Sequence, residues 1–359
     1  MAVTIVVGGQ FGSEGKGKVC AEIVRRDPKT AAVVRVGGTN SGHTAVDAYG
    51  RTLVLRQLPA GLAGGAVMAI LPPGSYIDLA VLRSEINELR LPPDRLFISP
   101  MARVITEEHR RWEALSELGE TIGSTQSGTG AAVVAMAARG AKNIALTGVQ
   151  ARDIAELRPY LRDTTHYLRT LLDKGKRVVI EGTQGFGLSL LHGGYWPNAT
   201  SRDTSAAGLL SEAGLSPLDV DDITLVLRYH PIRVAGNSGP LLNETTWEQV
   251  QRKSGRVDRL IEYTTVTKKV RRIAQFDPEL VRKAIEINRP TRIVLNHIDY
   301  IDPCASDGVF SAKIRDSIGD VEMAIGRRID WFGVSPAMII DRSDFLLADD
   351  GKAGLRQSA

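Results

Sequence analysis

Cysteine is scarce in this chain, and long apolar runs are missing. The 359 residues include two cysteines, Cys20 and Cys304, which are too few for a disulfide framework or a cysteine-based zinc site. No stretch approaches the roughly 18–20 apolar residues that cross a bilayer, and the opening MAVTIVVGGQ lacks the basic region of a secretory signal. These absences argue against membrane and disulfide-scaffold proteins and predict a protein of the reducing cytoplasm.

An excess of charge of either sign is also missing. The chain has 45 Lys and Arg against 41 Asp and Glu, a net charge of +4. That excess is too small to predict nucleic-acid binding, but it suits phosphate-bearing small molecules. With 43% hydrophobic and 24% charged residues, the composition is typical of a soluble globular protein. The length fits one large domain with insertions or two domains, and we expect a single domain over residues 1–359.

What the chain does contain is a repeated pattern of short β-branched runs that end in glycine-rich loops. Apolar strands that alternate with amphipathic segments predict the α/β class, a mostly parallel central sheet with helices on both faces. Ligands bind such sheets at the C-terminal ends of the strands. The expected strands are Val3–Val7, Ala31–Val36, Val178–Ile180, Thr224–Leu227 and Arg292–Leu295, with an antiparallel strand over Arg51–Leu58. The expected helices are Lys16–Arg25, Glu107–Glu117, Ala131–Ala138, Ala151–Leu172, Trp247–Lys253, Pro278–Ile287 and Asp320–Arg328.

The first chemical motif runs from Gly8 to Lys18, GGQFGSEGKGK, between the first strand and the first helix. Glycines let backbone N–H groups close on phosphates, and a helix N-terminus favours anions. Gly12 to Lys18 fits the G-x-x-x-x-G-K spacing of P-loops, but Val19 stands where a serine or threonine normally binds magnesium. We interpret the motif as a P-loop-like phosphate site; the alternative is a tight turn with solvated lysines.

Polar side chains in three further segments are candidates for substrate contacts. GGTNSGHT, residues 37–44, contains His43, a candidate general acid, although a lone histidine is more often structural. EGTQGFG, residues 181–187, could present the Gln184 amide to a heterocycle, and the hydroxyls of NATS, residues 198–201, could hold a phosphate; a plain loop explains both equally well. The interleaved hydroxyls and cations of residues 264–272, TTVTKKVRR, could bind a dicarboxylate. The alternative is that they form a solvated basic face or a nucleic-acid patch.

These motifs, in this order, resemble the adenylosuccinate synthetase family over roughly residues 3–336. The family signature G-x-Q-W-G-D-E-G-K-G-K appears as GGQFGSEGKGK, and G-G-x-N-A-G-H-T appears as GGTNSGHT. The resemblance implies a ligase in which a nucleoside triphosphate phosphorylates the 6-oxygen of a purine monophosphate and the aspartate amine then displaces that phosphate. It also implies Mg²⁺ between the phosphates, a homodimer, a mobile loop near 119–130 and an aspartate loop near 264–272.

The resemblance assigns roles to individual positions. It implies catalytic roles for Ser13, Lys16, His43 and Gln184, and magnesium contacts from Ser13 and Gly42. Triphosphate binding is implied for Gly12, Ser13, Gly15, Lys16, Gly17, Lys18, Thr44, His297, Asp299, Gly333 and Ser335. Purine monophosphate binding is implied for Ser13, Asn40, Ser124, Thr125, Arg139, Gln184, Thr200 and Lys269, with Arg139 reaching the partner subunit's site. Aspartate binding is implied for Thr264, Thr265, Val266, Thr267, Lys269 and Arg271.

Ser13 is the most informative departure from the family signature, because it replaces the aspartate that removes the purine N1 proton. A serine hydroxyl has a very high pKa and cannot replace that base. It is also smaller and neutral, and it leaves space beside C2, where guanine carries an amino group and hypoxanthine only hydrogen. The base-reading lysine is His297 here, the S-T-G-P segment reads GVSP from Gly333, and the first arginine of the aspartate loop is Lys269.

A serine at this position in a shortened chain resembles the phage branch of the family, which serves 2-aminoadenine DNA synthesis. The resemblance predicts a ligase that joins L-aspartate to dGMP with ATP or dATP, in the host cytoplasm if a phage encodes it. It predicts no nucleic-acid or membrane partner. The alternatives are an ordinary family member that uses IMP and GTP, and a nucleotide-binding regulator that has lost catalysis.

Overall fold

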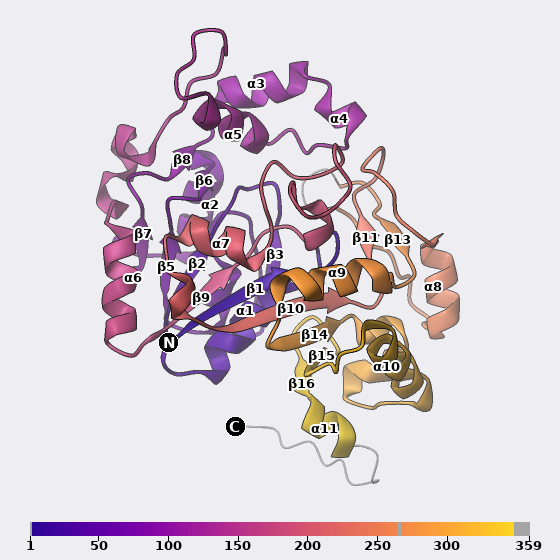
Figure 1. The fold of residues 1–359 in the computed structure, drawn as a ribbon. Coiled ribbons are helices and arrows are strands. Elements are labelled where there is room, and N and C mark those ends of the chain that lie inside the picture. The colour runs from indigo at the N-terminus through magenta and orange to yellow at the C-terminus, as the bar shows by residue number, and fades with distance from the viewer. Residues whose placement is uncertain (1, 265–267, 348–359) are drawn as a thin grey trace.

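The fold is built on a nine-stranded sheet (Figure 1). The computed structural model describes residues 2–264 and 268–347. Every pairing in the sheet is parallel except that of the edge strand β16 with β15. The strand order is β16 (Ile339–Asp341), β15 (Trp331–Gly333), β14 (Arg292–Asn296), β10 (Val220–Arg228), β1 (Val3–Gly8), β9 (Arg177–Glu181), β2 (Thr30–Arg35), β5 (Met68–Leu71) and β7 (Leu96–Ile98). The five expected core strands are all present in it.

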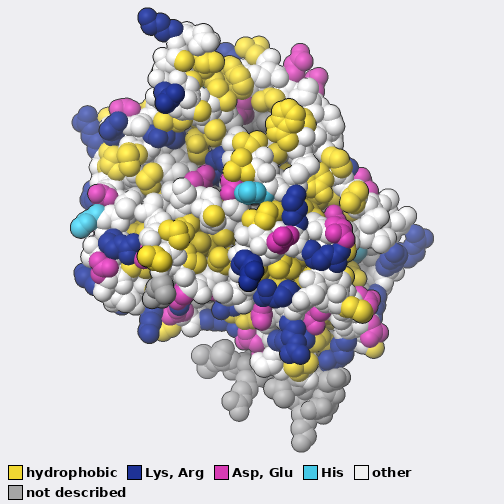
Figure 2. Space-filling model, viewed as in Figure 1, with side chains coloured by type: hydrophobic (Ala, Val, Ile, Leu, Met, Phe, Trp, Pro, Cys, Tyr) yellow, Lys and Arg dark blue, Asp and Glu magenta, His cyan; other side chains and the backbone are white. Residues whose placement is uncertain are grey.

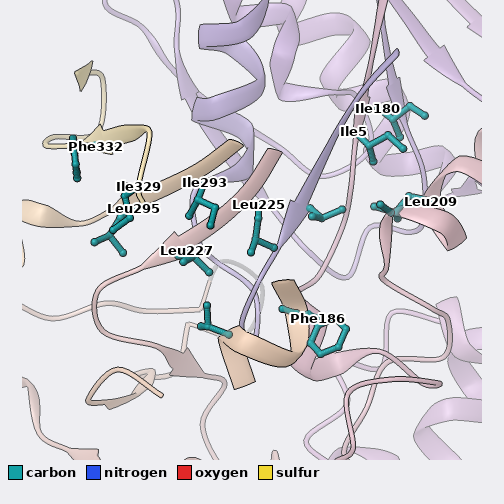
Figure 3. Packing of buried hydrophobic residues seen from close by; sticks show 14 of the residues in the cluster. Ile5, Ile180, Phe186, Leu209, Leu225, Leu227, Ile293, Leu295, Ile329 and Phe332 are labelled. Atoms are coloured by element: carbon teal, nitrogen blue, oxygen red, sulfur yellow. The ribbon is translucent and has the colours of Figure 1, made fainter. Parts of the chain in front are cut away.

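Helices cover both faces of this sheet, which confirms the predicted α/β class. Along β1, Val6 packs in the cluster that contains Val19 and Val24 of α1 (Lys16–Arg26). Ile5 points to the opposite face and packs in the cluster with α7 (Ala206–Ala213) and α9 (Pro278–Asn288). Figure 3 shows part of this second cluster, with residues from β1, β10 and β14 side by side. Alternate side chains of a strand face opposite ways, so an apolar run is buried on both sides.

Smaller elements surround the sheet and form the rim of the site. The short strands are β3 (His43–Val46) paired antiparallel with β4 (Thr52–Leu55), β6 (Tyr76–Ile77) paired parallel with β8 (Arg103–Val104), and β13 (Arg272–Ala274) between its antiparallel neighbours β11 (Ile232–Arg233) and β12 (Glu244–Thr245). The remaining helices are α2 (Leu79–Leu89), α3 (Glu107–Leu115), α4 (Leu118–Thr121), α5 (Thr129–Ala138), α6 (Thr164–Asp173), α8 (Trp247–Ser254), α10 (Ala312–Ile325) and α11 (Arg342–Leu347). Figure 1 places α3, α4 and α5 together above the strand ends.

Three expected elements differ from the structure. The single helix expected over Ala151–Leu172 is two 3₁₀ segments followed by α6, because Pro159 interrupts it and Asp163 caps the new start by accepting from the His166 backbone N–H. The helix expected over Asp320–Arg328 is α10, which Ser311 caps and Gly326 ends in a left-handed conformation. The expected loop over residues 119–130 contains part of α4 and the start of α5.

Lys and Arg side chains lie intermixed with Asp and Glu over the face drawn in Figure 2. That distribution agrees with the near balance of charge in the sequence. Within residues 2–264 and 268–347, none of the helices combines the length and the apolar character needed to span a bilayer.

Candidate active site

A cavity of about 640 Å³ lies where the strand-end loops converge. It is lined by residues of the P-loop-like motif and of the segments 37–44, 181–187, 198–201 and 264–272. The lining residues that sequence analysis predicted are Gly12, Ser13, Lys16, Asn40, Gly42, His43, Ser124, Thr125, Gln184, Thr200, Thr264, Lys269 and Arg271. The loops that follow the parallel strands therefore gather around one cavity, as the topology predicts.

The P-loop-like segment turns sharply between β1 and α1. Gly12, Ser13 and Gly15 all have left-handed backbone conformations, with φ of 96°, 56° and 94°. Glycine is required at position 15, because a Cβ there would also lie 2.7 Å from the amide nitrogen of Asn296. Ser13 adopts the same region at some cost in strain, and its side chain is exposed to the cavity.

The fully buried Glu14 organises the inside of this loop. Its Oε1 accepts a hydrogen bond from the Gly12 N–H at 2.7 Å, and its Oε2 accepts one from Lys16 Nζ at 2.7 Å. Both side chains are almost entirely buried. Lys16 is therefore held in place by a buried ion pair, and its ammonium group is oriented before any phosphate binds.

His43 belongs to a buried cluster with Glu181 and Arg35. Its Nδ1 lies 2.6 Å from Glu181 Oε1, and Arg35 Nη1 lies 2.7 Å from the same oxygen. The N–H groups of Ala60 and Gly61 also bond to the Glu181 carboxylate. Burial would raise the pKa of Glu181, but hydrogen bonding with His43 and the charge of Arg35 lower it to about 2.

The tautomer of His43 follows from this geometry. Burial, reinforced by the Arg35 charge, lowers the pKa of His43 to about 4. The neutral ring must carry its proton on Nδ1, because only an N–H can lie so close to an ionised carboxylate oxygen. Nε2 is then the ring nitrogen left for a ligand, and His43 lines the cavity.

Ser13 touches a second charged cluster. Its hydroxyl oxygen accepts a hydrogen bond from Arg271 Nη1, and its backbone carbonyl accepts one from Arg228 Nη1 at 3.2 Å. Arg228 and Arg271 are both paired with Glu262, which also accepts a hydrogen bond from the Tyr300 hydroxyl at 2.9 Å. Burial opposes ionisation of Glu262, but Arg228 and other nearby cations hold its pKa at about 2.

The residues expected to read the donor nucleotide lie together, outside the lining of this cavity. Lys18 Nζ donates to the Ser335 carbonyl at 2.9 Å, and a Cβ on Gly333 would lie 2.5 Å from that nitrogen. Asp299 accepts from Arg256 at 3.2 Å, and His297 has a left-handed backbone. Burial lowers the pKa of Lys18 to about 8, although Asp299 and Glu22 oppose the shift.

Other predicted positions surround these two regions. Gly17 packs tightly against β3, since a Cβ there would lie 2.9 Å from His43 Cβ and 3.0 Å from the Thr44 carbonyl. Arg139 is exposed at the C-terminal end of α5 and does not line the cavity. Thr265, Val266 and Thr267 lie outside the described residues, so their predicted contacts with aspartate stay predictions.

The oxygen atoms at the cavity suit a magnesium ion only when phosphates accompany it. The predicted protein ligands, the Ser13 hydroxyl and Gly42, are neutral, and the hydroxyl already accepts from Arg271. Among the residues that the structure describes, no group of three or more His, Cys, Asp or Glu side chains could hold a metal. Mg²⁺ commonly binds through substrate phosphates and a few protein oxygens, and that arrangement fits these ligands.

Sequence analysis missed the buried residues that support this site. Arg35, Glu181 and Arg228 each stand at the C-terminal end of an apolar core strand, where they are fully buried. A buried charge requires a partner of opposite charge. A charged residue at the end of an apolar strand therefore predicts a buried ion pair next to the strand-end loops. Arg35 pairs with Glu181, Arg228 pairs with Glu262, and the buried Glu14 pairs with Lys16.

The chain is similar in sequence to several adenylosuccinate synthetases. The sequence model described as adenylosuccinate synthetase matches residues 5–151 and 149–307. The adenylosuccinate synthetase of Thermococcus onnurineus is 36% identical over 353 residues, which cover 95% of this chain and 99% of that protein. The Methanocaldococcus jannaschii adenylosuccinate synthetase is 34% identical over 346 residues, or 94% of this chain and 95% of that protein.

Two solved structures are similar over nearly the whole chain. A fully ligated adenylosuccinate synthetase from Plasmodium falciparum has a TM-score of 0.80 at 20% identity and covers 95% of this chain and 100% of its own. The succinoaminodeoxyadenylate synthetase of cyanophage S-2L, bound to dGMP and to dATP as an energy donor, has a TM-score of 0.78 at 29% identity and covers 98% and 99%. The first likeness concerns the fold alone.

Proposed function

Because the chain belongs to the adenylosuccinate synthetase family and is a carbon–nitrogen ligase, we propose that it joins L-aspartate to dGMP. ATP or dATP supplies the energy, and the product is N6-succino-2-amino-2'-deoxyadenylate. The observation that carries the proposal is Ser13, which lines the cavity at the position where the family signature has aspartate. The similar phage synthetase bound to dGMP supports the same substrate.

The proposed reaction has two steps. The 6-oxygen of the purine attacks the γ-phosphorus of the donor, ADP or dADP leaves, and a water or phosphate oxygen accepts the N1 proton of the purine. The aspartate amine then attacks C6, the C6–O bond breaks, phosphate leaves, and the nitrogen loses a proton. In this scheme Lys16, fixed by Glu14, faces the transferring phosphoryl group, and electrostatic preorganisation of that kind lowers the barrier.

His43 acts at the 6-oxygen in this scheme. In the free protein it is neutral at pH 7 and donates Nδ1–H to Glu181. Bound phosphates bring negative charge, which raises the pKa of the ring. The cationic ring then donates from Nε2 to the 6-oxygen while Glu181 holds its orientation, in the manner of a carboxylate–histidine pair.

Ser13 and Arg271 define the N1 edge of the purine in this proposal. The Arg271 guanidinium lies against the Ser13 hydroxyl, so positive charge is available where negative charge develops as N1 loses its proton. The small hydroxyl leaves room for the C2 amino group. A carboxylate would place a larger, charged group at this point.

A magnesium ion carried by the donor phosphates would contact Ser13 and Gly42, and it would neutralise negative charge on the transferring phosphoryl group. Lys18, Asp299 and Ser335 then hold the donor, and Thr264, Lys269 and Arg271 hold aspartate. We further propose a cytoplasmic homodimer, in a phage host if the chain is phage-encoded, in which Arg139 reaches the partner's nucleotide.

A second candidate function is the ordinary family reaction with IMP and GTP, because the archaeal relatives at 34–36% identity are adenylosuccinate synthetases. Phosphate release separates the two candidates. We expect rapid release with dGMP, aspartate and ATP, and slow release when IMP replaces dGMP. A clear preference for IMP would reject the dGMP proposal, and release that stops without aspartate would confirm that the amine is consumed.

A further inference from the structure

Ser41 is one of several serines in the cavity wall, and the proposed reaction does not use its hydroxyl. It precedes Gly42 and His43 in the segment GGTNSGHT, where the family signature has alanine. The residue lines the cavity, together with Ser13. Both positions at which a serine replaces the signature residue therefore lie in the wall of the same cavity, and each introduces a hydroxyl.

The Ser41 hydroxyl has no hydrogen-bond partner within the part of the chain that the structure describes, and its oxygen is buried. The backbone around it is firmly held, because Arg35 Nη2 donates to the Ser41 carbonyl at 2.9 Å. A buried hydroxyl without a partner is unfavourable. Rotation about the Cα–Cβ bond of Ser41 would turn the hydroxyl toward the cavity without breaking a hydrogen bond. A ligand with a donor group can therefore bond to the Ser41 oxygen, and no existing hydrogen bond is lost.

A count of donors indicates which ligand group Ser41 meets. Guanine presents three N–H donors on its N1–C2 edge, whereas hypoxanthine presents one. The Ser13 oxygen has two lone pairs; Arg271 already occupies one of them, and the proposed magnesium contact would occupy the other. The Ser13 oxygen therefore does not satisfy these donors, so a pocket for guanine needs a further acceptor. Ser41 provides an oxygen that is free of partners inside the described protein.

We propose that Ser41 is a specificity-determining residue, whose hydroxyl oxygen accepts a hydrogen bond from the C2 amino group of a bound guanine nucleotide. This inference rests on the proposed function and names a residue that the family signature does not supply. Ser13 leaves space for the C2 amino group because its side chain is small, and the Ser41 oxygen stabilises the amino group by accepting a hydrogen bond from it. The two serines thus act on the same substituent by different physical means.

The test compares dGMP with dIMP, which differ only at C2, in wild type and Ser41→Ala. We expect wild type to favour dGMP, and Ser41→Ala to lower kcat/KM for dGMP by about tenfold while dIMP stays within about twofold. Ser41→Cys, a weak acceptor of similar size, should lie between them. The melting temperature of Ser41→Ala should not fall, since the lost hydroxyl has no partner in the free protein.

Thr39→Val is the matched control. Thr39 carries another buried hydroxyl without a partner among the described residues, in the same loop but outside the cavity lining, so its variant should leave both nucleotides unaffected. If Ser41→Ala lowered kcat/KM equally for dGMP and dIMP, or left kcat/KM for dGMP unchanged, the role assigned to Ser41 would be overturned and the proposed function would stand. A wild-type enzyme that favours dIMP would overturn the proposed function and, with it, this inference.

Discussion

Arg271 donates a hydrogen bond from Nη1 to the Ser13 hydroxyl oxygen, which joins the residue before β13 to the P-loop-like turn. Arg271 and Arg228 share a single carboxylate, that of Glu262. The region around Ser13 therefore has two guanidinium groups beside one carboxylate, and an aspartate at position 13 would add a second negative charge. Replacement of that aspartate by serine changes both the space and the charge at this edge of the cavity.

Ser13→Asp should move the substrate preference toward IMP. The carboxylate would pair with Arg271 and occupy the space that we assign to the C2 amino group, so the ratio of kcat/KM for dGMP to that for IMP should fall at least about tenfold. Ser13→Asn is the matched control, because it adds the same volume without charge. If Ser13→Asp left the ratio unchanged, position 13 would not select the purine.

Glu181→Gln should lower kcat far more than it changes the KM of either nucleotide. The amide cannot stabilise a cationic His43 ring as the carboxylate does, and a correctly oriented general acid contributes roughly a hundredfold or more. Glu85→Gln is the control, since Glu85 is also buried and bonds to backbone N–H groups, but outside the cavity lining. Steady-state kinetics that show similar kcat values for both variants would contradict a positioning role for Glu181.

Stability should decline as the pH falls below 6.5. Burial lowers the pKa of four histidines from the usual 6.5: to about 4 for His43 and His230, to well below 6.5 for His297, and to a value below 6.5 for His109. The rings of His43, His230 and His297 stay neutral in the folded protein while the unfolded chain binds protons, so each costs up to about 1.4 kcal/mol per pH unit as the pH falls below 6.5. Urea denaturation at pH 7.5, 6.5 and 5.5 measures this slope.

His230→Gln serves as the control for that slope, because His230 lies outside the proposed catalytic machinery. The variant should lower the slope of the free energy of unfolding against pH by the contribution of one buried histidine. Burial raises the pKa of Glu85, Glu212 and Asp299 above their usual values. When these carboxyl groups take up protons in the folded protein they stabilise it, which opposes the effect of the histidines. The comparison is therefore made above pH 5. A free energy of unfolding that is flat or rises from pH 6.5 to 5.5 would refute neutral buried histidines.

Magnesium should bind only with the nucleotide. The predicted protein ligands, Ser13 and Gly42, offer neutral oxygens, so the phosphates must supply the negative charge that holds the ion. Calorimetric titration with MgCl₂ alone should give no measurable heat of binding, whereas titration in the presence of dGMP and a non-hydrolysable ATP analogue should give a saturable signal. Tight binding of Mg²⁺ to the free protein would show a carboxylate site that these residues do not account for.

The sequence predicted the cavity residues better than the groups that support them. Ser13, His43 and Gln184 follow apolar strands, and parallel topology alone brings such loops to one edge. The Glu181–His43 and Glu262–Arg228 pairs depend on which strands become neighbours and on the register between them, which local pattern does not determine. Likewise, the prediction of a single helix over Ala151–Leu172 was wrong, because Pro159 interrupts the helix even though the apolar residues keep a helical spacing.

A competition in a single tube tests the central claim most directly. The enzyme would receive equal concentrations of dGMP and IMP with aspartate, ATP and Mg²⁺, and mass spectrometry would measure the ratio of the two succinylated products at low conversion. That ratio equals the ratio of the two kcat/KM values. We predict that the succinylated 2-aminopurine deoxynucleotide dominates by at least about tenfold, whereas a mixture dominated by adenylosuccinate would contradict the role assigned to Ser13.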